Sequence, residues 1–153
     1  MTLDQETQLS REETDSILGR HETGGLSLAR EGEPYAIPIS YGYDTEVRRF
    51  YLRLVSTPES EKRRFLASSP HARLVVYEED DPIYRSVVTT GTLNEVPRDE
   101  LTVDHIDQYG DAKRPLFEIW GESRRDLDIQ LYQLEPDELS GRRIEIERDD
   151  TDP

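Results

Sequence analysis

The chain has 153 residues, of which 35% are charged and only 33% hydrophobic, and its formal net charge is −15. A field of that sign repels nucleic acids and anionic membrane surfaces, so neither is an expected partner. The sequence has no cysteine, which excludes disulfides and thiolate chemistry. Seventeen arginines stand against two lysines, and carboxylates are scattered along the chain. This pattern is typical of a halophile's proteins, with an ordinary acidic cytosolic protein as the alternative.

The length predicts one domain. We expect a disordered leader over residues 1–8, a folded domain over 9–147 and a disordered acidic tail over 148–153. No apolar run approaches the ~20 residues of a membrane span, and the N-terminus lacks the basic and apolar regions of a signal peptide. A cytoplasmic protein follows. The histidines, His21, His71 and His105, show no metal-ligand spacing, so no metal site is expected.

The first third of the chain predicts a helix followed by three strands. Ser10 and Glu13 form a capping box, and the glycines in 23–25 are expected to end that helix. Strands are expected at 26–30, 34–44 and 47–55, with turns at "EGEP" and "YDTE" between them. Such short connections favour an antiparallel meander.

The remaining chain continues the mainly β pattern. A short helix is expected within 56–70, with Thr57 as N-cap and Pro58 at its first position. Strands follow at 72–78 and 83–96, the second with Gly91 as a bulge or bend, and a last strand is expected at 127–135. Residues 97–110 show weak helical periodicity, and 116–122 are ambiguous. About six strands with two or three short helices predict a small barrel or an α+β sheet.

The stretch "PYAIPISYGYD" at 34–44 is the least charged part of this acidic chain. Its alternating faces hold Tyr35, Ile37 and Ile39 on one side, and Ala36, Pro38 and Ser40 on the other. Because Pro38 cannot donate a ladder hydrogen bond, it should sit at a sheet edge or a bulge. A flat ligand can lie against the backbone of such a strand, although an ordinary half-buried strand has the same pattern.

A second stretch, "VSTPESEK" at 55–62, is a candidate phosphate site. A strand ends at Val55, Ser56 and Thr57 supply hydroxyls, and a helix then begins with free backbone N–H groups. Lys62, one of only two lysines, follows within that helix. The alternative is that the hydroxyls are plain helix caps and that the nearby glutamates satisfy the helix dipole.

These pieces occur in a familiar order. The segments "GGLSLAREGEPYAIPISYGYD", "STPESEKRRFLASSPHARLVVY" and "YRSVVTTGTLNEV" resemble the pyridoxamine 5′-phosphate oxidase-like FMN-binding proteins. The similarity covers roughly residues 10 to 135 and is closest to the branch with nitroimidazole-resistance-type flavoproteins. It implies a mainly β fold, a six- to seven-stranded antiparallel split β-barrel with a few short helices. It also implies a homodimer with FMN in the groove between subunits.

The resemblance also implies which residues bind the cofactor. The strand over residues 35–40 would lie along the isoalloxazine ring, contacting it largely through backbone groups. The phosphate would be held where Val55, Ser56, Thr57 and Lys62 fall in the family pattern. Ser86 would approach the flavin from a neighbouring strand, and Trp120 would be an aromatic contributed by the partner subunit.

The sequence departs from the family's oxidases at Tyr35 and Ser40, where those enzymes carry basic residues. A flavin- or nitro-compound-reductase-like FMN oxidoreductase therefore fits better than pyridoxamine phosphate oxidation. No side-chain acid or base is assigned, because the cofactor itself carries the hydride or electrons. Three alternatives stay open: a reductase using the deazaflavin F420, a non-catalytic flavin or haem binding protein, and a purely structural acidic protein.

Overall fold

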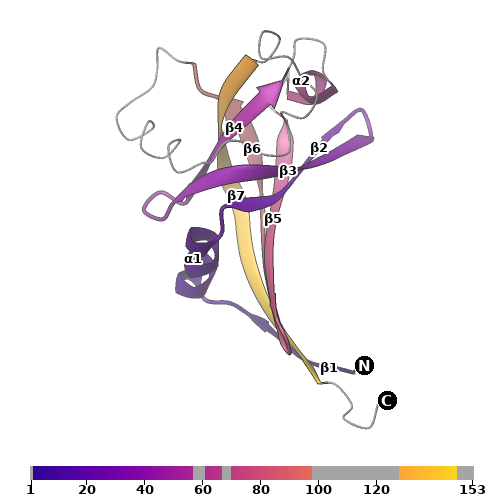
Figure 1. Ribbon diagram of the computed structural model, residues 1–153, viewed down its shortest axis with the longest axis vertical. Helices are drawn as coiled ribbons and strands as arrows, with labels where there is room; N and C mark the ends of the chain where they lie inside the picture. Colours follow the sequence, from indigo (N-terminus) through magenta and orange to yellow (C-terminus); the bar gives the residue numbers. More distant parts are fainter. Residues whose placement is uncertain (1, 57–60, 67–69, 98–127, 148–153) are drawn as a thin grey trace.

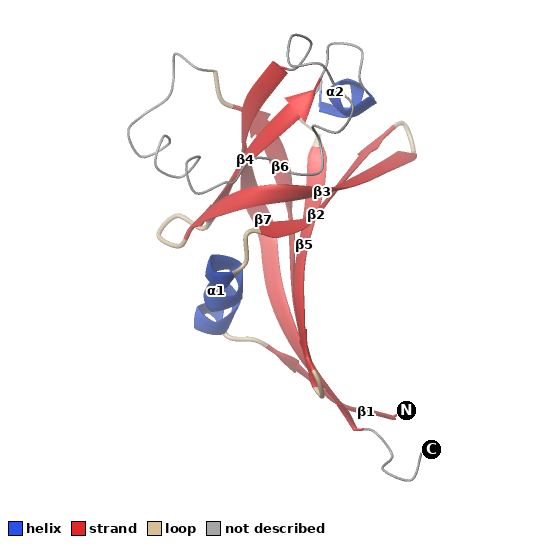
Figure 2. Cartoon of the chain, in the orientation of Figure 1, coloured by secondary structure: helices blue, strands red, loops and turns tan. Residues whose placement is uncertain are grey.

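The computed structural model describes residues 2–56, 61–66, 70–97 and 128–147, and within them the side chains of 2–6, 55–56, 61–63, 128–129 and 147 are not described. The elements in chain order are β1 (Thr2–Gln8), α1 (Arg11–Arg20), β2 (Thr23–Arg30), β3 (Glu33–Asp44), β4 (Arg49–Ser56), α2 (Glu61–Leu66), β5 (His71–Asp80), β6 (Ile83–Glu95) and β7 (Asp128–Glu147). Every strand pairing between them is antiparallel. The predicted mainly β class with short helices is confirmed (Figures 1 and 2).

The sheet closes on itself. Its order is β1-β7-β4-β3-β2-β5-β6, and an additional pairing of β6 with β7 completes the barrel, with β1 outside on β7. β3 is shared between two neighbours: residues 33–40 pair with β2, and residues 41–44 pair with β4. This division leaves the first part of β3 with a partner on one side only among the described strands. The arrangement is the predicted split barrel.

The hairpin between β2 and β3 turns at Glu31 and Gly32. Both residues have positive φ, 52° and 79°, as a type I′ turn requires. This turn chemistry sets the register that pairs Gly25 with Pro38. The predicted turn at "EGEP" is therefore confirmed.

β7 is longer than the sequence indicated. The predicted strand at 127–135 continues through Pro136 to Glu147 and is 20 residues long. Proline suggested a strand end because it lacks an amide donor. The structure accommodates it at a register shift between Thr90 and Gly91, where Gly91 faces Pro136. The predicted bulge at Gly91 is thus confirmed, and it is the feature that lets β7 continue.

The extra length of β7 also explains the N-terminus. Residues 1–8 were expected to be a disordered leader, but Thr2–Gln8 forms β1 and pairs with β7 from Arg142 to Glu147. A polar segment has no hydrophobic periodicity to signal a strand. It pairs here because the last part of β7 presents an edge whose backbone groups need partners.

The N-terminal helix confirms one prediction and corrects another. The capping box is present, with the Glu13 amide donating to Ser10 Oγ at 3.2 Å and the Ser10 amide donating to Glu13 Oε1 at 3.4 Å. However, α1 ends at Arg20, and His21 caps it in an extended conformation. Gly24 and Gly25 do not cap the helix, because they already lie in β2.

The core fills the barrel and the space under α1. Ile17 and Leu18 of α1 are buried, and the hydroxyl of buried Tyr41 donates to the Leu18 carbonyl at 2.8 Å. Burial also raises the pKa of Tyr41, so this hydroxyl stays protonated as a donor. Phe50 packs edge-on against the Tyr41 ring with centroids 5.6 Å apart. These contacts fix α1 to β3.

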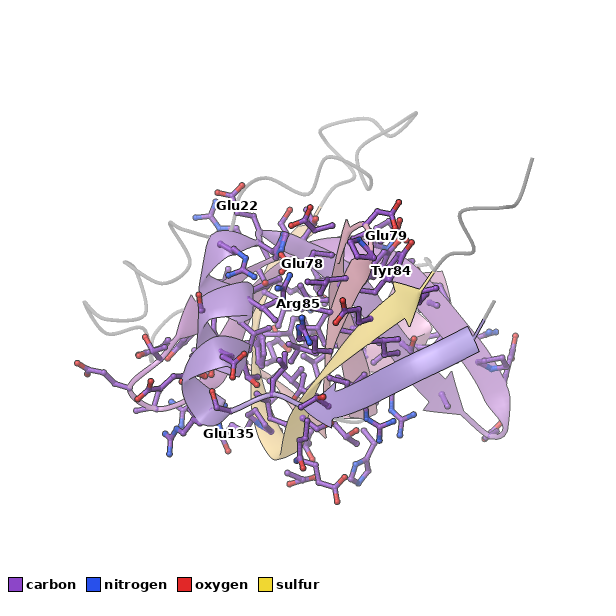
Figure 3. The ribbon with its side chains drawn as sticks, turned by 90° about the horizontal axis from the view of Figure 1, so that it is seen from below. Glu22, Glu78, Glu79, Tyr84, Arg85 and Glu135 are labelled. Carbon is purple, nitrogen blue, oxygen red and sulfur yellow. The ribbon has the colours of Figure 1, made fainter. Side chains whose placement is uncertain are left out.

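The C-terminal end of α1 is held to β5 by one carboxylate. Glu78 accepts hydrogen bonds from Arg20 Nε at 3.0 Å, from Arg20 Nη2 and from Arg85 Nη1 at 3.5 Å, and His21 Nε2 lies 2.6 Å from it. Glu78 is mostly buried at 15% side-chain exposure, and Figure 3 shows it beside Arg85. The hydrogen bonds from Arg20, followed by the one with His21, outweigh desolvation and lower the pKa of Glu78 to about 2.

Replacing Glu78 with Gln should destabilise the fold and reduce its acid sensitivity. The pKa of Glu78 is depressed on folding from 4.5 to about 2. Its contribution is therefore complete above about pH 4.5 and is lost as the pH falls toward 2. We expect Glu78→Gln to lower the free energy of unfolding at pH 7 by about 1–2 kcal/mol, since the Arg20 partner is half exposed. Denaturant unfolding across that pH range, with exposed Glu79→Gln as the control, checks this; equal effects of the two variants would contradict it.

A second prediction concerns the bulge. A Cβ added at Gly91 would lie 2.0 Å from the Glu135 carbonyl oxygen, whereas one added at Gly25 would meet nothing within 4 Å. Gly91→Ala must push the backbone of β7 away, so we expect a loss of about 2–3 kcal/mol. Gly25→Ala should change stability by less than about 1 kcal/mol. Thermal or denaturant unfolding of both variants compares them, and a neutral Gly91→Ala would show that the bulge is not tightly packed.

Candidate functional site

The open edge of β3 is the first component of the site. The Tyr41 amide donates to the Glu22 carbonyl at 2.9 Å, on the side of β2. Because successive amides of a strand point to opposite sides, the even positions from 34 to 40 face away from β2. Pro34 and Pro38 therefore remove no hydrogen bond from the β2–β3 ladder. The prediction that Pro38 lies at an edge is confirmed among the described strands.

The two faces of β3 differ as expected over most of its first half. Tyr35 and Ile37 are half-buried and Ile39 is fully buried, while Ala36 and Pro38 are exposed. Ser40 differs from the expectation, because it is buried at 3% exposure where β3 passes to its pairing with β4.

The outward face next to this edge is flat. Pro38 pairs with Gly25, which pairs with Val75 of β5. Two residues further along the same face, Ala36 of β3 pairs with Ser27 of β2. All of these except half-buried Val75 are exposed, and none has a side chain longer than valine. The surface therefore offers a planar ligand a neutral platform that spans β3, β2 and β5.

Arginines border this neutral surface. Exposed Arg73 follows Ser27 in the same row of the sheet. At the tip of the hairpin, Arg30 Nη1 donates to the Arg64 carbonyl at 2.7 Å, and Arg64 pairs with Glu33 at 3.5 Å. In a chain with net charge −15, a neutral surface with cations at its border is a favourable place for an anionic ligand.

The short helix α2 is held beside β3. The Tyr35 ring stacks on Phe65 with centroids 5.1 Å apart and an interplanar angle of 16°. Phe65 is buried, so this contact anchors α2 against the start of the open edge. α2, which follows β4 in the chain, thus packs on the face of β3 opposite to Ala36 and Pro38, beside the start of the open edge.

Three of the predicted phosphate residues lie at the end of β4 and the start of α2. Val55 and Ser56 are the last residues of β4, and Lys62 is the second residue of α2. Their side chains are not described, and Thr57 lies outside the described residues. The phosphate site therefore stays a prediction.

Ser86, another of the predicted cofactor residues, lies away from the open edge. Ser86 is on β6 between Tyr77 and Arg142, and both β2 and β5 separate it from β3. A single chain does not bring Ser86 next to residues 35–40. Trp120 lies outside the described residues.

Three members of the flat surface, Gly25, Ser27 and Val75, were missed by the sequence analysis. The signal was present in "TGGLSLAR", where small residues at 25, 27 and 29 alternate with Leu26 and Leu28. We had interpreted its glycines as a helix end. Alternation marks one face of a strand, but only the pairing of β2 with β3 and β5 shows which surface it completes.

Two further observations bear on the kind of site. Among the described residues, no group of three His, Asp or Glu side chains is arranged to hold a metal ion. No described helix has the length and apolar character needed to cross a membrane.

Comparisons with known proteins agree with the fold. The family model described as pyridoxamine 5′-phosphate oxidase matches residues 10–143. None of the curated proteins matches the sequence.

Several solved structures share the fold. An FAD-binding protein from Mesorhizobium loti superposes with a TM-score of 0.66 at 22% identity, over 90% of this chain and 97% of that one. An FAD and haem binding protein from Mycobacterium smegmatis gives 0.60 at 22%, over 97% and 77%. A candidate 5-nitroimidazole antibiotic resistance protein from Bacteroides thetaiotaomicron gives 0.64 at 16%, over 94% and 91%.

Proposed function

Because the chain belongs to the pyridoxamine 5′-phosphate oxidase family, we propose that it is an FMN-binding flavoprotein that acts as an oxidoreductase. The observation that carries this proposal is the flat, neutral surface beside the open edge of β3. The M. loti and M. smegmatis proteins, which have the same fold, are described as binding FAD, and this supports a flavin as the ligand class.

The surface suits an isoalloxazine ring in shape and in hydrogen bonding. Gly25, Ser27, Ala36 and Pro38 present no long side chain to a plane laid over them. Along the open edge, the amides of Ala36 and Ser40 point outward and Pro38 between them has none. Two separated donors suit the separated carbonyl oxygens of a flavin better than a partner strand, which needs an unbroken ladder.

We propose that Ser56, Thr57 and Lys62 bind the FMN phosphate, with Val55 ending the strand that leads to them. The stacking of Tyr35 on Phe65 supports this, because it holds α2 beside the start of the open edge. Lys62 would supply a point charge within reach of a phosphate. The side chains of Arg30 and Arg64 lie at the same end, where Arg64 is paired with Glu33.

We also propose that the protein is a homodimer with FMN between subunits. An exposed platform binds a ring on one side only, and a second chain would cover the other side. Two strands lie between Ser86 and β3 in one chain. Ser86 and Trp120 are therefore proposed as contacts that depend on the partner subunit.

A bound flavin supplies hydride or electron transfer, and the chain supplies binding and orientation. The described platform carries no carboxylate or imidazole, so it offers the substrate no side-chain acid or base. This supports a flavin- or nitro-compound-reductase-like activity, in which the reacting group needs mainly access to the ring. A non-catalytic flavin or haem binding protein is the second candidate, supported by the M. smegmatis protein described as binding both.

The composition supports a cytoplasmic protein that works in strong salt, as expected for a halophilic source. With a net charge of −15, carboxylates repel one another across the surface. At 1 M salt the Debye length is about 3 Å, so this repulsion is screened beyond that distance.

The direct test is the absorption spectrum of the protein purified in strong salt, before and after adding FMN, FAD or F420. We expect a yellow protein that retains FMN. Protein that takes up none of the three would overturn the proposal, and preference for F420 would favour the deazaflavin reductase. Turnover with NADH or NADPH and a nitro compound then separates an enzyme from a binding protein.

Lys62→Ala should weaken FMN binding through the phosphate alone. Losing a charge-assisted hydrogen bond of about 1.5–3 kcal/mol predicts an increase in the FMN dissociation constant of tenfold or more. Riboflavin lacks the phosphate, so its affinity should not change. Fluorescence titration measures both ligands, with Arg11→Ala on exposed α1 as the control. Equal losses for FMN and riboflavin would place Lys62 elsewhere than at the phosphate.

Gly25→Leu should instead weaken binding of the ring. The added side chain enters open space, so the fold is preserved, but it projects from the centre of the platform. We expect FMN and riboflavin to lose affinity together by at least tenfold, with little change in melting temperature. Gly19→Leu, also in open space but on α1, is the matched control. Unchanged flavin affinity in Gly25→Leu would show that the ring does not lie here.

A further inference from the structure

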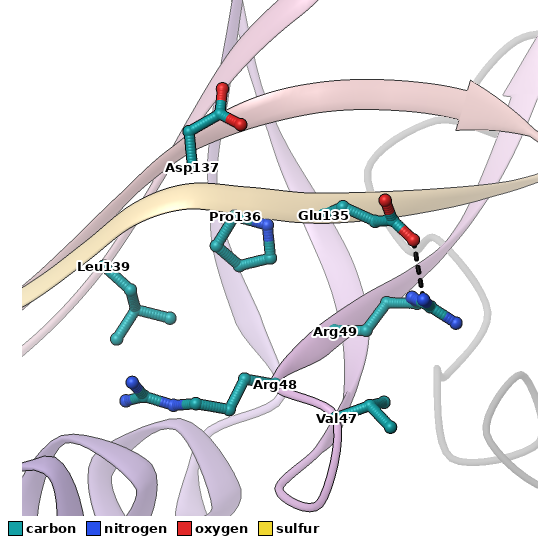
Figure 4. A pocket seen from close by; sticks show the side chains of 7 residues that line it. All are labelled: Val47, Arg48, Arg49, Glu135, Pro136, Asp137 and Leu139. Carbon is teal, nitrogen blue, oxygen red and sulfur yellow. Dashed lines mark hydrogen bonds and ion pairs between the residues drawn. The ribbon is translucent and has the colours of Figure 1, made fainter.

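Two large side chains with much apolar surface are exposed in the described part of the chain, Val47 at 56% and Tyr77 at 67%. Val47 lies in the turn before β4, at a cavity lined mainly by charged residues (Figure 4). Arg48 and Arg49 at that cavity already form ion pairs with carboxylates, at N···O distances of 3.0 and 2.6 Å. We assign no ligand to that cavity. Tyr77 has different surroundings.

Tyr77 borders the flat surface beside the open edge of β3. A single exposed ring is ordinary on a protein surface, so its position matters more than its exposure. Val75 is the residue that β5 contributes to the flat surface. Tyr77 is two residues beyond Val75 on β5, and side chains at that spacing point to the same face of a strand. The Cα atoms of the two residues are therefore about 7 Å apart, within the length of a tyrosine side chain.

The flat surface ends at Tyr77. The pairing of β2 with β5 stops at Gly25 and Val75, and among the described pairings β2 supplies no partner for Tyr77. On its other side Tyr77 pairs with Ser86 of β6, whose side chain is short. The tyrosine ring thus forms a side wall at the corner where the flat surface stops.

The two ends of the flat surface differ in polarity. At β3, the amides of Ala36 and Ser40 point outward from the open edge. At β5, the backbone of Val75 is paired on both sides, with β2 and with β6. The β5 end therefore offers a ligand side-chain surface rather than backbone hydrogen bonds. Val75 and Tyr77 supply that surface.

The cation on β5 lies on the other side of Val75. Arg73 pairs with Ser27, which is nearer than Gly25 to the tip of the β2–β3 hairpin. Arg73 therefore borders the flat surface in the direction of the proposed phosphate end. Tyr77 borders it in the opposite direction.

An isoalloxazine ring has a matching difference between its ends. Its pyrimidine end carries two carbonyl oxygens, and its dimethylbenzene end is apolar. Neighbouring strands lie about 4.8 Å apart, so β3 and β5 are about 10 Å apart, close to the length of the ring. A ring whose carbonyl oxygens accept from the open edge of β3 thus brings its dimethylbenzene end over β5.

We propose that Tyr77 contacts the dimethylbenzene end of the bound flavin and selects for its two methyl groups. This inference rests on the proposed flavin-binding function and adds a specificity-determining residue to that site. An apolar wall beside the methyl groups removes them from water, so a flavin that carries them binds more tightly than one that lacks them.

Riboflavin and its analogue without the two methyl groups test the inference on the full chain freed of any bound flavin, by calorimetry. We expect the unmodified protein to prefer riboflavin by about tenfold, because the methyl groups are buried on binding. In Tyr77→Ala the preference should fall to about threefold or less, because the wall is removed. The melting temperature should change little, since the side chain is exposed.

Two further variants serve as controls. Tyr77→Phe keeps the ring and should keep the preference. Glu79→Gln, at an exposed position on the same face of β5, should also keep it. Because a preference is a ratio of two affinities, a variant that weakens flavin binding in general leaves it unchanged.

The outcomes separate this inference from the function on which it rests. Equal losses for riboflavin and the analogue in Tyr77→Ala would overturn the inference and leave flavin binding intact. So would a reduced preference in Glu79→Gln, or no preference in the unmodified protein. An unmodified protein that binds neither flavin, nor FMN, would overturn the proposed function and this inference with it.

Discussion

The barrel depends on the pairing of β6 with β7. β6 pairs with β7 along its whole length, from Ile83 to Glu95, and this contact closes the sheet. β7 can meet β4 with its first part and β1 with its last part only because it continues through Pro136. The missing Cβ of Gly91 makes room for that continuation, since the Glu135 carbonyl occupies the place where a Cβ would lie. One close backbone approach therefore fixes how the two halves of the sheet join.

The β6–β7 pairing closes one side of the barrel. On the other side, β3 divides its pairing between two different strands. β3 pairs with β2 before residue 41 and with β4 after it, so each half has one side without a described partner strand. An unpaired edge is normally an aggregation hazard, and proline is a common protection. Here both prolines fall at positions whose amides would face outward. The same two residues protect the edge, because they remove the donors that another strand would use, and they leave it open to the proposed ligand.

Local patterns in the sequence predicted those elements that local chemistry determines. The capping box at Ser10, the turn at Glu31 and Gly32, the alternation of 35–39 and the bulge at Gly91 each rest on residues close in sequence. β1 and the second half of β7 could not be predicted in this way, because β1 forms only on β7 and the second half of β7 forms only on β6 and β1. The proline in β7 and the polar residues of β1 are unfavourable until the long-range pairing forms.

The same distinction applies to the candidate site. The edge of β3 was predictable, because Pro38 has no amide hydrogen to donate to a neighbouring strand. The platform was not, because Gly25 and Val75 are adjacent to Pro38 only through two strand pairings. Ser86 shows the reverse case: its resemblance to a flavin contact was readable in the sequence, but the topology places two strands between it and β3.

Charge connects the platform to the acidic composition. A net charge of −15 opposes the approach of any anionic cofactor at low ionic strength. The Debye length falls from about 10 Å at 0.1 M salt to about 3 Å at 1 M, so in strong salt a phosphate experiences only its immediate neighbours. Around the platform those neighbours are neutral side chains with Arg30, Arg64 and Arg73 at the border. A surface that is unfavourable for an anion at long range thus becomes favourable at short range, which would allow so acidic a chain to hold the proposed phosphorylated cofactor.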